Sequence, residues 1–479
     1  MNSQLRERER ERERERRICS IRERMRGESA CAVELFRFAQ VKRLRHEVLN
    51  LIRSASTQHR QEKKLVLVYE RWLHRAMLSE DRVLEALLPT GAREALRDEL
   101  TRAISTANED DKDIESLTDR IMKASRACVS RLKDFRIREE EKPSLEQNGC
   151  AVLAVKRGNL VRMSLKGKEK PYFTISSMRY EKLKRMYIKA RRMSMHLEQK
   201  KKKKKKSVTS LSGRHEKKVG EEKEEYIDSD FKHKVFCLIV RYDALGGSGY
   251  HAAISGECFR ILASPPMNVQ AELFASPLNS TLGHFCSAFG DTDTPFGSLG
   301  SFFDCVSSLG AGCFEVNPPF VEDVIARVID ALIAKLRSAS RPICFVVVLP
   351  EWRDTVPNWS MLEEYSQQDT SIRIRSVEHG YVDGALWKQG RVDRGEEHRV
   401  SSYDTKIFFL RGGGAASVPS DVRTKIEHAM RRARGPQANV KELEQRFRKR
   451  KQDEHRASSA SQCFRHDNQT SAKLSRCDA

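Results

Sequence analysis

The sequence lacks any apolar run approaching the roughly 18 residues that a membrane-spanning helix needs. Its N-terminal segment alternates Arg and Glu over residues 6–17 and has no apolar core of the kind found in secretory signals. We therefore expect a soluble, intracellular protein.

Paired cysteines are also missing. The twelve cysteines are scattered singly, and none forms a CxxC pair at the spacing of zinc or thiol redox sites. This pattern is typical of reduced, partly buried thiols rather than of a disulfide framework. We expect no metal site.

Apolar residues make up only 39% of the chain, against 33% charged residues, and the charges occur in blocks. Part of the chain is therefore expected to be solvated tail or linker. The net charge of +22 favours a polyanionic partner, because basic side chains neutralise phosphates and release their counterions. Nucleic acid is the first candidate, and a membrane surface or simple solubility would fit the same charge.

Composition and periodicity divide the chain into five segments. Apolar residues recur at helical spacing in the second segment, and seven consecutive lysines open the polar part of the third. The segments are a disordered Arg/Glu arm (1–27), a basic helical domain with a short β segment (28–190), a Lys-rich linker (191–232), an α/β domain (233–415) and a basic C-terminal tail (416–479).

The α/β domain is predicted from strands that alternate with helices. Strands are expected over 269–277, 312–316, 342–350, 371–380 and 404–412, and a helix of about five turns over 321–339. This alternation predicts a doubly wound α/β sheet.

The stretch FEVNPPFVED, residues 314–323, places Asn-Pro-Pro-Phe between a predicted strand and a helix. In an open α/β sheet ligands bind at that edge. The side-chain carbonyl of Asn317 and the backbone carbonyl of Pro318 can each accept a hydrogen from an adenine amine, while Phe320 stacks on the ring. The prolines hold both acceptors in place, so positioning can drive methyl transfer to the amine without a metal or a strong base. A plain turn is the alternative interpretation.

Four motifs occur in the order and spacing of one known family. FASPLN (274–279), FCSAFGDTDTPFGSLGSFFD (285–304), FEVNPPF (314–320) and VVVLPEWRD (346–354) resemble the phosphorylated CTD-interacting factor family, the cap-specific adenosine N6-methyltransferases. The resemblance implies a Rossmann-like class I methyltransferase domain that uses S-adenosylmethionine. It further implies methylation of N6 of the adenosine next to the m7G cap of mRNA, in the nucleus, with residues 28–190 binding capped RNA and with no membrane partner.

The family's roles carry over to matching positions. The resemblance implies that the target adenine is held by Asn317, Pro318, Pro319 and Phe320. It implies that the methyl donor is bound by the same four residues, by Val321, and by Phe274, Ala275, Ser276, Pro277 and Asn279. It implies that the capped substrate is bound by Arg45, Arg75, Glu322, Pro350, Glu351, Trp352, Arg353 and Asp354.

Some of these positions also have a purely structural interpretation. Trp352 could stack on the cationic methylated guanine or pack at a strand end, and Arg45 and Arg75 could hold phosphates or lie on a solvated helix face. Asp291 and Asp293 fit either the donor's ribose or amine or the capping of a turn.

The resemblance has one departure. Animal members carry a WW module, which needs two tryptophans about twenty residues apart, and Trp72 is the only tryptophan before Trp352. We expect no WW module, which argues against direct docking on the RNA polymerase II tail. Alternatives to the cap enzyme are an N6-adenine methyltransferase acting on internal RNA or DNA, and a catalytically silent RNA-binding scaffold.

Overall fold

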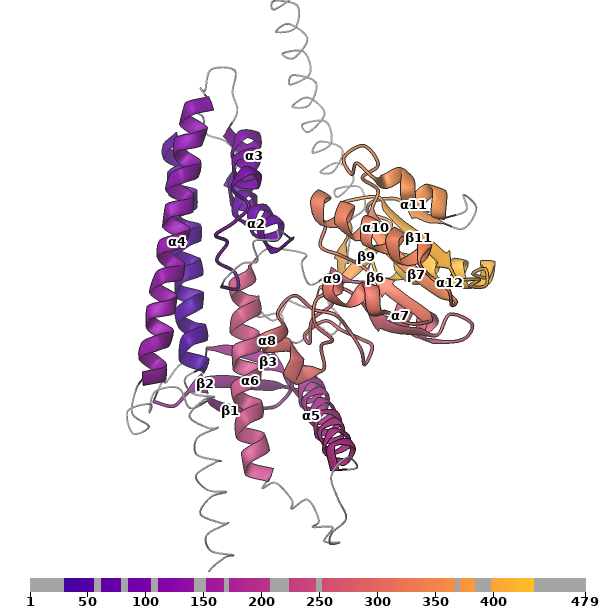
Figure 1. Cartoon of the computed structure of the whole chain (residues 1–479), viewed down its shortest axis with the longest axis horizontal. Coiled ribbons are helices and arrows are strands. Elements are labelled where there is room, and N and C mark those ends of the chain that lie inside the picture. Colours follow the sequence, from indigo (N-terminus) through magenta and orange to yellow (C-terminus); the bar gives the residue numbers. More distant parts are fainter. Residues whose placement is uncertain are drawn as a thin grey trace, which may run out of the picture.

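The computed structural model describes most of the chain between residues 30 and 434 (Figure 1). The described ranges are 30–55, 62–78, 85–104, 111–141, 152–167, 172–206, 224–246, 252–366, 371–383 and 398–434. The expected Arg/Glu arm and the end of the basic tail lie outside the described residues.

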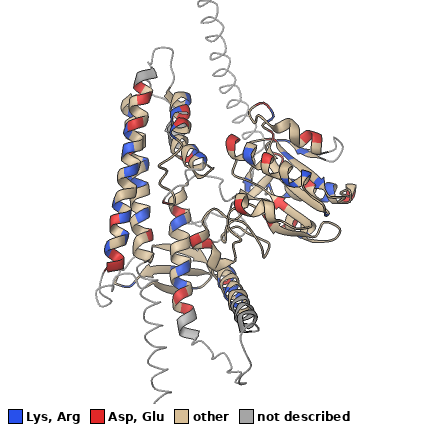
Figure 2. Cartoon of the chain, viewed as in Figure 1, with Lys and Arg blue, Asp and Glu red and all other residues tan. Residues whose placement is uncertain are grey.

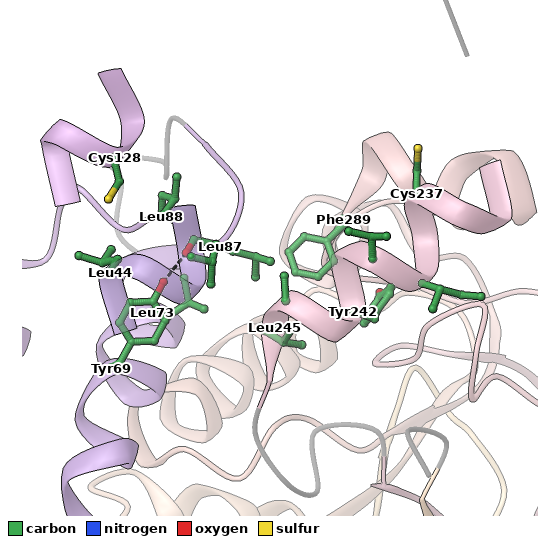
Figure 3. Packing of buried hydrophobic residues seen from close by; sticks show 14 of the residues in the cluster. Leu44, Tyr69, Leu73, Leu87, Leu88, Cys128, Cys237, Tyr242, Leu245 and Phe289 are labelled. Atoms are coloured by element: carbon green, nitrogen blue, oxygen red, sulfur yellow. Dashed lines mark hydrogen bonds between the residues drawn. The ribbon is translucent and has the colours of Figure 1, made fainter. Parts of the chain in front are cut away.

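The first part of the chain is helical. It contains a helix over residues 30–55 and the helices α2 (Glu62–Leu78), α3 (Arg93–Ile104) and α4 (Asp111–Glu141). Apolar residues at helical spacing on these helices are buried against one another (Figure 3). Trp72 is fully buried, and the Tyr69 hydroxyl donates a hydrogen bond to the Leu87 carbonyl.

An antiparallel sheet of three strands follows the helices. It consists of β1 (Val152–Arg157), β2 (Leu160–Leu165) and β3 (Phe173–Ser176), in that order. Two long helices come next, α5 (Ser177–Lys206) and α6 (Glu224–Leu245).

Helices α6 and α5 each correct one of the expected boundaries. The side chains of α6, among them Phe231 and Phe236, are buried in the same core as the first helices, so the expected domain start at residue 233 cuts through a helix of the first core. Helix α5 runs unbroken to Lys206, so the linker does not start at residue 191. The sequence KVFCLIVRYDAL is apolar on all sides of a helix, which predicts burial but not the core in which it is buried.

The second part of the chain holds a mixed five-stranded sheet in the order β5-β6-β7-β11-β8. The strands are β5 (Val269–Glu272), β6 (Gly312–Val316), β7 (Ile343–Pro350), β11 (Thr405–Gly412) and β8 (Ile372–Ile374). Strands β5, β6 and β7 run parallel, and β11 is antiparallel to both of its neighbours. The chain therefore has the mixed helix and sheet architecture that the sequence predicts.

Single-residue bridges extend this sheet beyond β5. Phe285 pairs in parallel with Glu272, and Ser298 pairs in parallel with Phe285. The chain thus moves outward from β5 through residues 285 and 298, and then returns to form β6 on the other side of β5. Such a reversal of strand order is a topological switch point, where ligands of open α/β sheets bind.

Helices cover both faces of the sheet (Figure 1). Helices α10 (Glu322–Arg337) and α11 (Trp359–Tyr365) pack on the face that holds Phe345 and Val347. Helices α7 (Gly256–Ala263) and α12 (Ser420–Arg432) pack on the face that holds Val346 and Val348. The remaining elements are β4 (Ala252–Ala253), β9 (Gly380–Asp383), β10 (His398–Val400), α8 (Gly290–Asp293), η1 (Thr294–Phe296), α9 (Phe302–Cys305) and η2 (Val306–Ser308).

The expected tail from residue 416 needs a correction as well. Helix α12 buries one apolar face in the core of the α/β part. That face holds Val422, Ile426 and Met430, which recur at helical spacing. The fold therefore includes residues up to 434. Among the described residues, no helix is long and apolar enough to cross a membrane.

Candidate active site

Three predicted motifs follow three neighbouring parallel strands. FASPLN follows β5, NPPF follows β6, and the turn from Glu351 to Asp354 follows β7. Glu272 is in register with Glu315, and Val316 with Val347. Because the carboxyl ends of parallel strands meet at one edge, the structure brings the three motifs together.

Asn317 is oriented by a contact with β4. Its side-chain Nδ2 donates a hydrogen bond to the Ala252 carbonyl at 3.3 Å, which leaves Oδ1 as the acceptor of the amide. The backbone N–H of Val321 donates to the Pro319 carbonyl at 2.8 Å, and α10 begins at the next residue, Glu322. Pro318 is buried and Phe320 is half-buried, so the motif forms a compact turn between β6 and α10.

Phe320 belongs to a group of four rings, the site aromatic cluster: Phe320, Trp352, Tyr381 and Tyr403. The Phe320 ring centroid lies 6.2 Å from that of Trp352 and 6.1 Å from that of Tyr381, and the centroids of Trp352 and Tyr403 are 5.2 Å apart. All three pairs meet edge to face, a favourable arrangement for aromatic rings. The cluster places stacking surfaces beside the NPPF turn.

Tyr381 and Tyr403 were not predicted from the sequence. Tyr381 lies in β9, and its hydroxyl and the Nε2 of His379 lie 2.7 and 2.8 Å from the Thr405 hydroxyl. Burial lowers the pKa of His379 to about 4, so its ring is neutral at physiological pH. Thr405 is in register with Pro350, which brings these residues to the edge where β7 ends. The only sequence signal for Tyr381 was an aromatic residue in the short stretch GYVD (380–383).

The turn after β7 is held by charges. The N–H of Glu351 donates to the Asp404 carbonyl at 2.8 Å, and its carboxylate lies 2.6 Å from Arg373. Arg353 pairs with Glu363 at 2.5 Å, while Asp354 is exposed. These contacts hold the turn beside β11 and leave the Trp352 ring half-buried.

The FASPLN turn is closed by its own side chains. Asn279 Oδ1 accepts hydrogen bonds from the Ser276 backbone N–H at 2.7 Å and from its hydroxyl at 2.9 Å. The N–H of Ala275 donates to the Cys286 carbonyl at 2.9 Å, and the Phe274 ring lies 4.8 Å from that of Phe302. Pro277 is buried, and the turn is fixed at the switch point of the sheet.

Two buried carboxyl groups lie beneath these turns. Glu272 and Glu315 are paired across β5 and β6, and each side chain is almost fully buried. Burial raises the pKa of Glu272 to about 7, while the backbone N–H groups of Thr281 and Leu282 oppose this rise. Burial, together with the Glu272 carboxyl, raises the pKa of Glu315 well above its usual range. Among the described residues, no group of three or more His, Cys, Asp or Glu side chains could hold a metal ion.

Asp291 and Asp293 have partners on α6. Arg241 donates to both Asp291 oxygens, at 3.0 and 2.8 Å, and the Tyr242 hydroxyl donates to Asp293 at 2.7 Å. Burial raises the pKa of Asp293 to about 6. These contacts favour the structural interpretation, since both carboxylates tie the short helix α8 to α6.

The two arginines assigned to the capped substrate also have internal partners. Arg45 donates to the Leu245 carbonyl at the end of α6, and its guanidinium carbon lies 5.0 Å from the centre of the Tyr69 ring. Arg75 is 8% exposed; its Nη2 lies 3.3 Å from Glu99, and its Nε pairs with Asp323 in the first turn of α10. Contact of either arginine with phosphate stays a prediction.

The comparisons with known proteins agree with the motifs. Residues 182–384 match the family described as "Phosphorylated CTD interacting factor 1 WW domain", a range that includes β5, β6 and β7. That description names a WW domain; the expectation that this chain lacks one stays a prediction.

Two curated relatives carry the name "mRNA (2'-O-methyladenosine-N(6)-)-methyltransferase". The Mus musculus protein is 32% identical over 190 residues, which are 38% of this chain and 26% of that protein. The Homo sapiens protein is 31% identical over 214 residues, which are 43% of this chain and 30% of that protein. The chain thus matches less than a third of the length of either relative. Through this region, the chain is similar to the phosphorylated CTD-interacting factor family.

Proposed function

We propose that this protein is an S-adenosylmethionine-dependent methyltransferase that methylates N6 of the adenosine next to the m7G cap of mRNA. The observation that carries the proposal is the meeting of three motifs at one sheet edge, with the Asn317 amide oriented by Ala252. The names of the two curated relatives give N6-methylation of a 2'-O-methyladenosine in mRNA.

The fold that we propose is the Rossmann-like class I methyltransferase fold. Its support is the strand order β5-β6-β7-β11-β8, in which β11 runs antiparallel to β7. Residues 285 and 298 extend this order beyond β5. In this arrangement the FASPLN turn lies at the switch point, and the NPPF turn lies beside it.

The residues present fit a sulfonium methyl donor. The half-buried Phe274 ring and the carbonyl groups of the FASPLN turn suit a cation, because aromatic faces and carbonyl oxygens both stabilise positive charge. Phe274, Ala275, Ser276, Pro277, Asn279 and Val321 would hold S-adenosylmethionine, which supplies an electrophilic methyl group when bound.

The acceptor groups of the NPPF turn would bind the adenine amine. Asn317 Oδ1 and the Pro318 carbonyl accept its two N–H groups, and Phe320 stacks on the ring. This geometry turns the nitrogen lone pair out of the ring's π system and toward the methyl group. Because both acceptors are fixed before the substrate binds, their orientation lowers the barrier without any rearrangement during the reaction.

The cap would bind at the turn after β7. Trp352 offers a stacking surface for the methylated guanine, and Glu351 and Glu322 offer negative charge to a cationic base. The basic helical part would contact phosphates, and the nucleus is the compartment where such a substrate is made. The lysines over 200–206 and the sequence RFRKRK (446–451) fit nuclear import or RNA affinity.

One experiment tests this function. The protein and a labelled methyl donor are incubated with m7G-capped RNA that starts in A, the same RNA without its cap, capped RNA that starts in G, and DNA. We expect label only in the first, at N6 of its first adenosine. Equal labelling of capped and uncapped RNA would overturn the cap assignment. Absence of label from all four substrates would favour a silent RNA-binding scaffold.

A further inference from the structure

Helix α5 carries a line of exposed cations, the α5 basic stripe, which consists of Arg185, Lys189 and Arg192. Spacings of four and three residues place the three side chains on one face of the helix. Each is exposed, and none of the three forms an ion pair with a carboxylate among the described residues. Figure 2 shows Lys and Arg repeated along α5.

Other cations of α5 are engaged within the protein. The Lys182 ammonium donates to the Ser280 carbonyl, and burial lowers its pKa to about 8. Lys184 lies 3.5 Å from Asp228 of α6. The α5 basic stripe differs from these residues, since its charges are turned toward solvent.

The apolar face of α5 is already covered. Tyr180, Leu183 and Tyr187 are buried, and the Tyr187 ring packs near Phe231 and Phe296. A helix that lies on a membrane needs a free apolar face to enter the lipid. The α5 basic stripe therefore fits a polyanion in solution better than a lipid surface.

The stripe begins beside the candidate active site. Lys182, one turn before the stripe, contacts Ser280, which directly follows the FASPLN turn. The Lys189 ammonium lies close to Gly283, because a Cβ built on that glycine would be 3.0 Å from it. The helix continues from there through seven further lysines, ending at Lys206. From Arg185 to Lys206 the helix spans about 30 Å.

We propose that the α5 basic stripe binds backbone phosphates of the transcript body, downstream of the nucleotide at the NPPF turn. This inference rests on the proposed function, because it assigns a path to the same RNA substrate. Phosphate contacts are independent of base sequence, so the stripe adds affinity for long transcripts of any sequence. A capped RNA of about four nucleotides is too short to use most of the stripe.

The test compares three proteins. The first is wild type, and the second is R185E/K189E/R192E, with the neutral variant R185Q/K189Q/R192Q in reserve in case the reversal prevents folding. The third is the matched control R260E/R341E/K425E, which reverses exposed cations on or beside α7, α10 and α12. The Kd for uncapped single-stranded RNA of about thirty nucleotides is measured by fluorescence anisotropy over a range of salt concentrations.

We expect the stripe variant to raise that Kd about tenfold and to reduce the slope of log Kd against log salt by about 2, since each phosphate contact on a single strand contributes about 0.7. For methyl transfer we expect a raised KM for long capped RNA, an unchanged kcat, and an unchanged KM for capped RNA of about four nucleotides. The matched control should behave as wild type.

Equal Kd values for wild type and the stripe variant would overturn the inference, as would an equal loss in the matched control. A variant that changes only nuclear accumulation would identify the stripe as an import signal and refute RNA binding. If wild type methylates no capped RNA, the proposed function fails, while the binding measurement still decides whether the stripe binds RNA.

Discussion

The side-chain nitrogen of Asn317 donates a hydrogen bond to the backbone carbonyl of Ala252 at 3.3 Å. This contact joins the residue after β6 to the short strand β4, which lies more than sixty residues earlier in the chain. Because an amide has one acceptor and one donor group, using the nitrogen for structure leaves the oxygen for the substrate. The orientation that the proposed chemistry needs therefore exists in the protein alone.

Replacing Asn317 with Ala should lower kcat by at least about 100-fold, the effect of removing one preorganised group that stabilises a transition state. The loss of one hydrogen bond should cost only about 1 kcal/mol of unfolding free energy. Asn317→Asp keeps an acceptor and should lose less activity than the alanine variant. Single-turnover methyl transfer and thermal unfolding measure the two effects.

Asn358 provides the matched control. Its side chain donates to the Ala326 carbonyl at 2.7 Å and to Asp330 at 2.8 Å, both on α10. Asn358→Ala should lower stability and leave kcat unchanged. An Asn317→Ala protein that retains more than about a tenth of wild-type kcat would contradict the role given to that amide.

Trp352 should give the protein its preference for a methylated guanine. We expect wild type to bind m7GpppA more tightly than GpppA in calorimetry, and Trp352→Ala to lose most of that preference. A cation over an indole contributes about 0.5–2 kcal/mol, which corresponds to a Kd ratio of about 2 to 30. Tyr365→Ala, which removes a half-buried ring on α11, serves as control. Equal loss of affinity for both dinucleotides would instead support packing of Trp352 against Phe320 and Tyr403.

The sequence predicted the elements whose patterns are strong. PICFVVVLP reads as a strand buried on both faces, and β7 spans all but the first of its residues. The apolar positions of α10 recur at three and four residues, and the helix buries that face. Once the strands were placed, the positions of FASPLN, NPPF and the turn after β7 followed from the rule for parallel sheets.

What the sequence could not predict depends on contacts between distant segments. Tyr381 and Tyr403 reach the site aromatic cluster because β11 is inserted between β7 and β8, an arrangement that no local pattern specifies. Phe285 and Ser298 extend the sheet through single-residue bridges, which are too short for strand periodicity. The carboxylate partners of Arg75 come from α3 and α10, so the sequence could suggest a solvated arginine but not a buried one.

Arg75 should stabilise the contact between α2 and α10. Its guanidinium bridges the buried Glu99 and the half-exposed Asp323, and Arg327 of α10 donates to the Leu78 carbonyl at the end of α2. Truncating one partner of a buried pair costs about 3–5 kcal/mol. Glu99 keeps contacts with Arg71 and Arg102, so we expect Arg75→Ala to lower the unfolding free energy by about 2 kcal/mol in the absence of RNA.

A double-mutant cycle separates this role from phosphate binding. Asp323→Ala should cost less than about 1 kcal/mol, since its side chain is half-exposed, and the double variant should show coupling between the two sites. Chemical denaturation without RNA measures all four proteins. Unchanged stability of Arg75→Ala, combined with a raised KM for capped RNA, would restore the phosphate-binding role and contradict the structural one.

Glu272 should make the protein less stable as the pH rises. Burial raises its pKa from 4.5 to about 7, so between these values the folded state binds a proton that the unfolded state has released. Stability therefore falls with increasing pH across that window, by about 3 kcal/mol in total for this group. Asp293, whose pKa burial raises to about 6, acts in the same direction and remains in the variant.

Glu272→Gln removes the titration while keeping an acceptor for the N–H groups of Thr281 and Leu282. We expect its denaturation midpoint to fall less steeply than that of wild type between pH 5 and pH 7, a decline that Asp293 and the buried Glu315 still sustain. Glu364→Gln, which removes an exposed carboxylate on α11, should keep the wild-type slope. Parallel declines for wild type and Glu272→Gln would show that the carboxyl group ionises as readily in the folded chain as in water, and that the FASPLN turn does not cover a protonated Glu272.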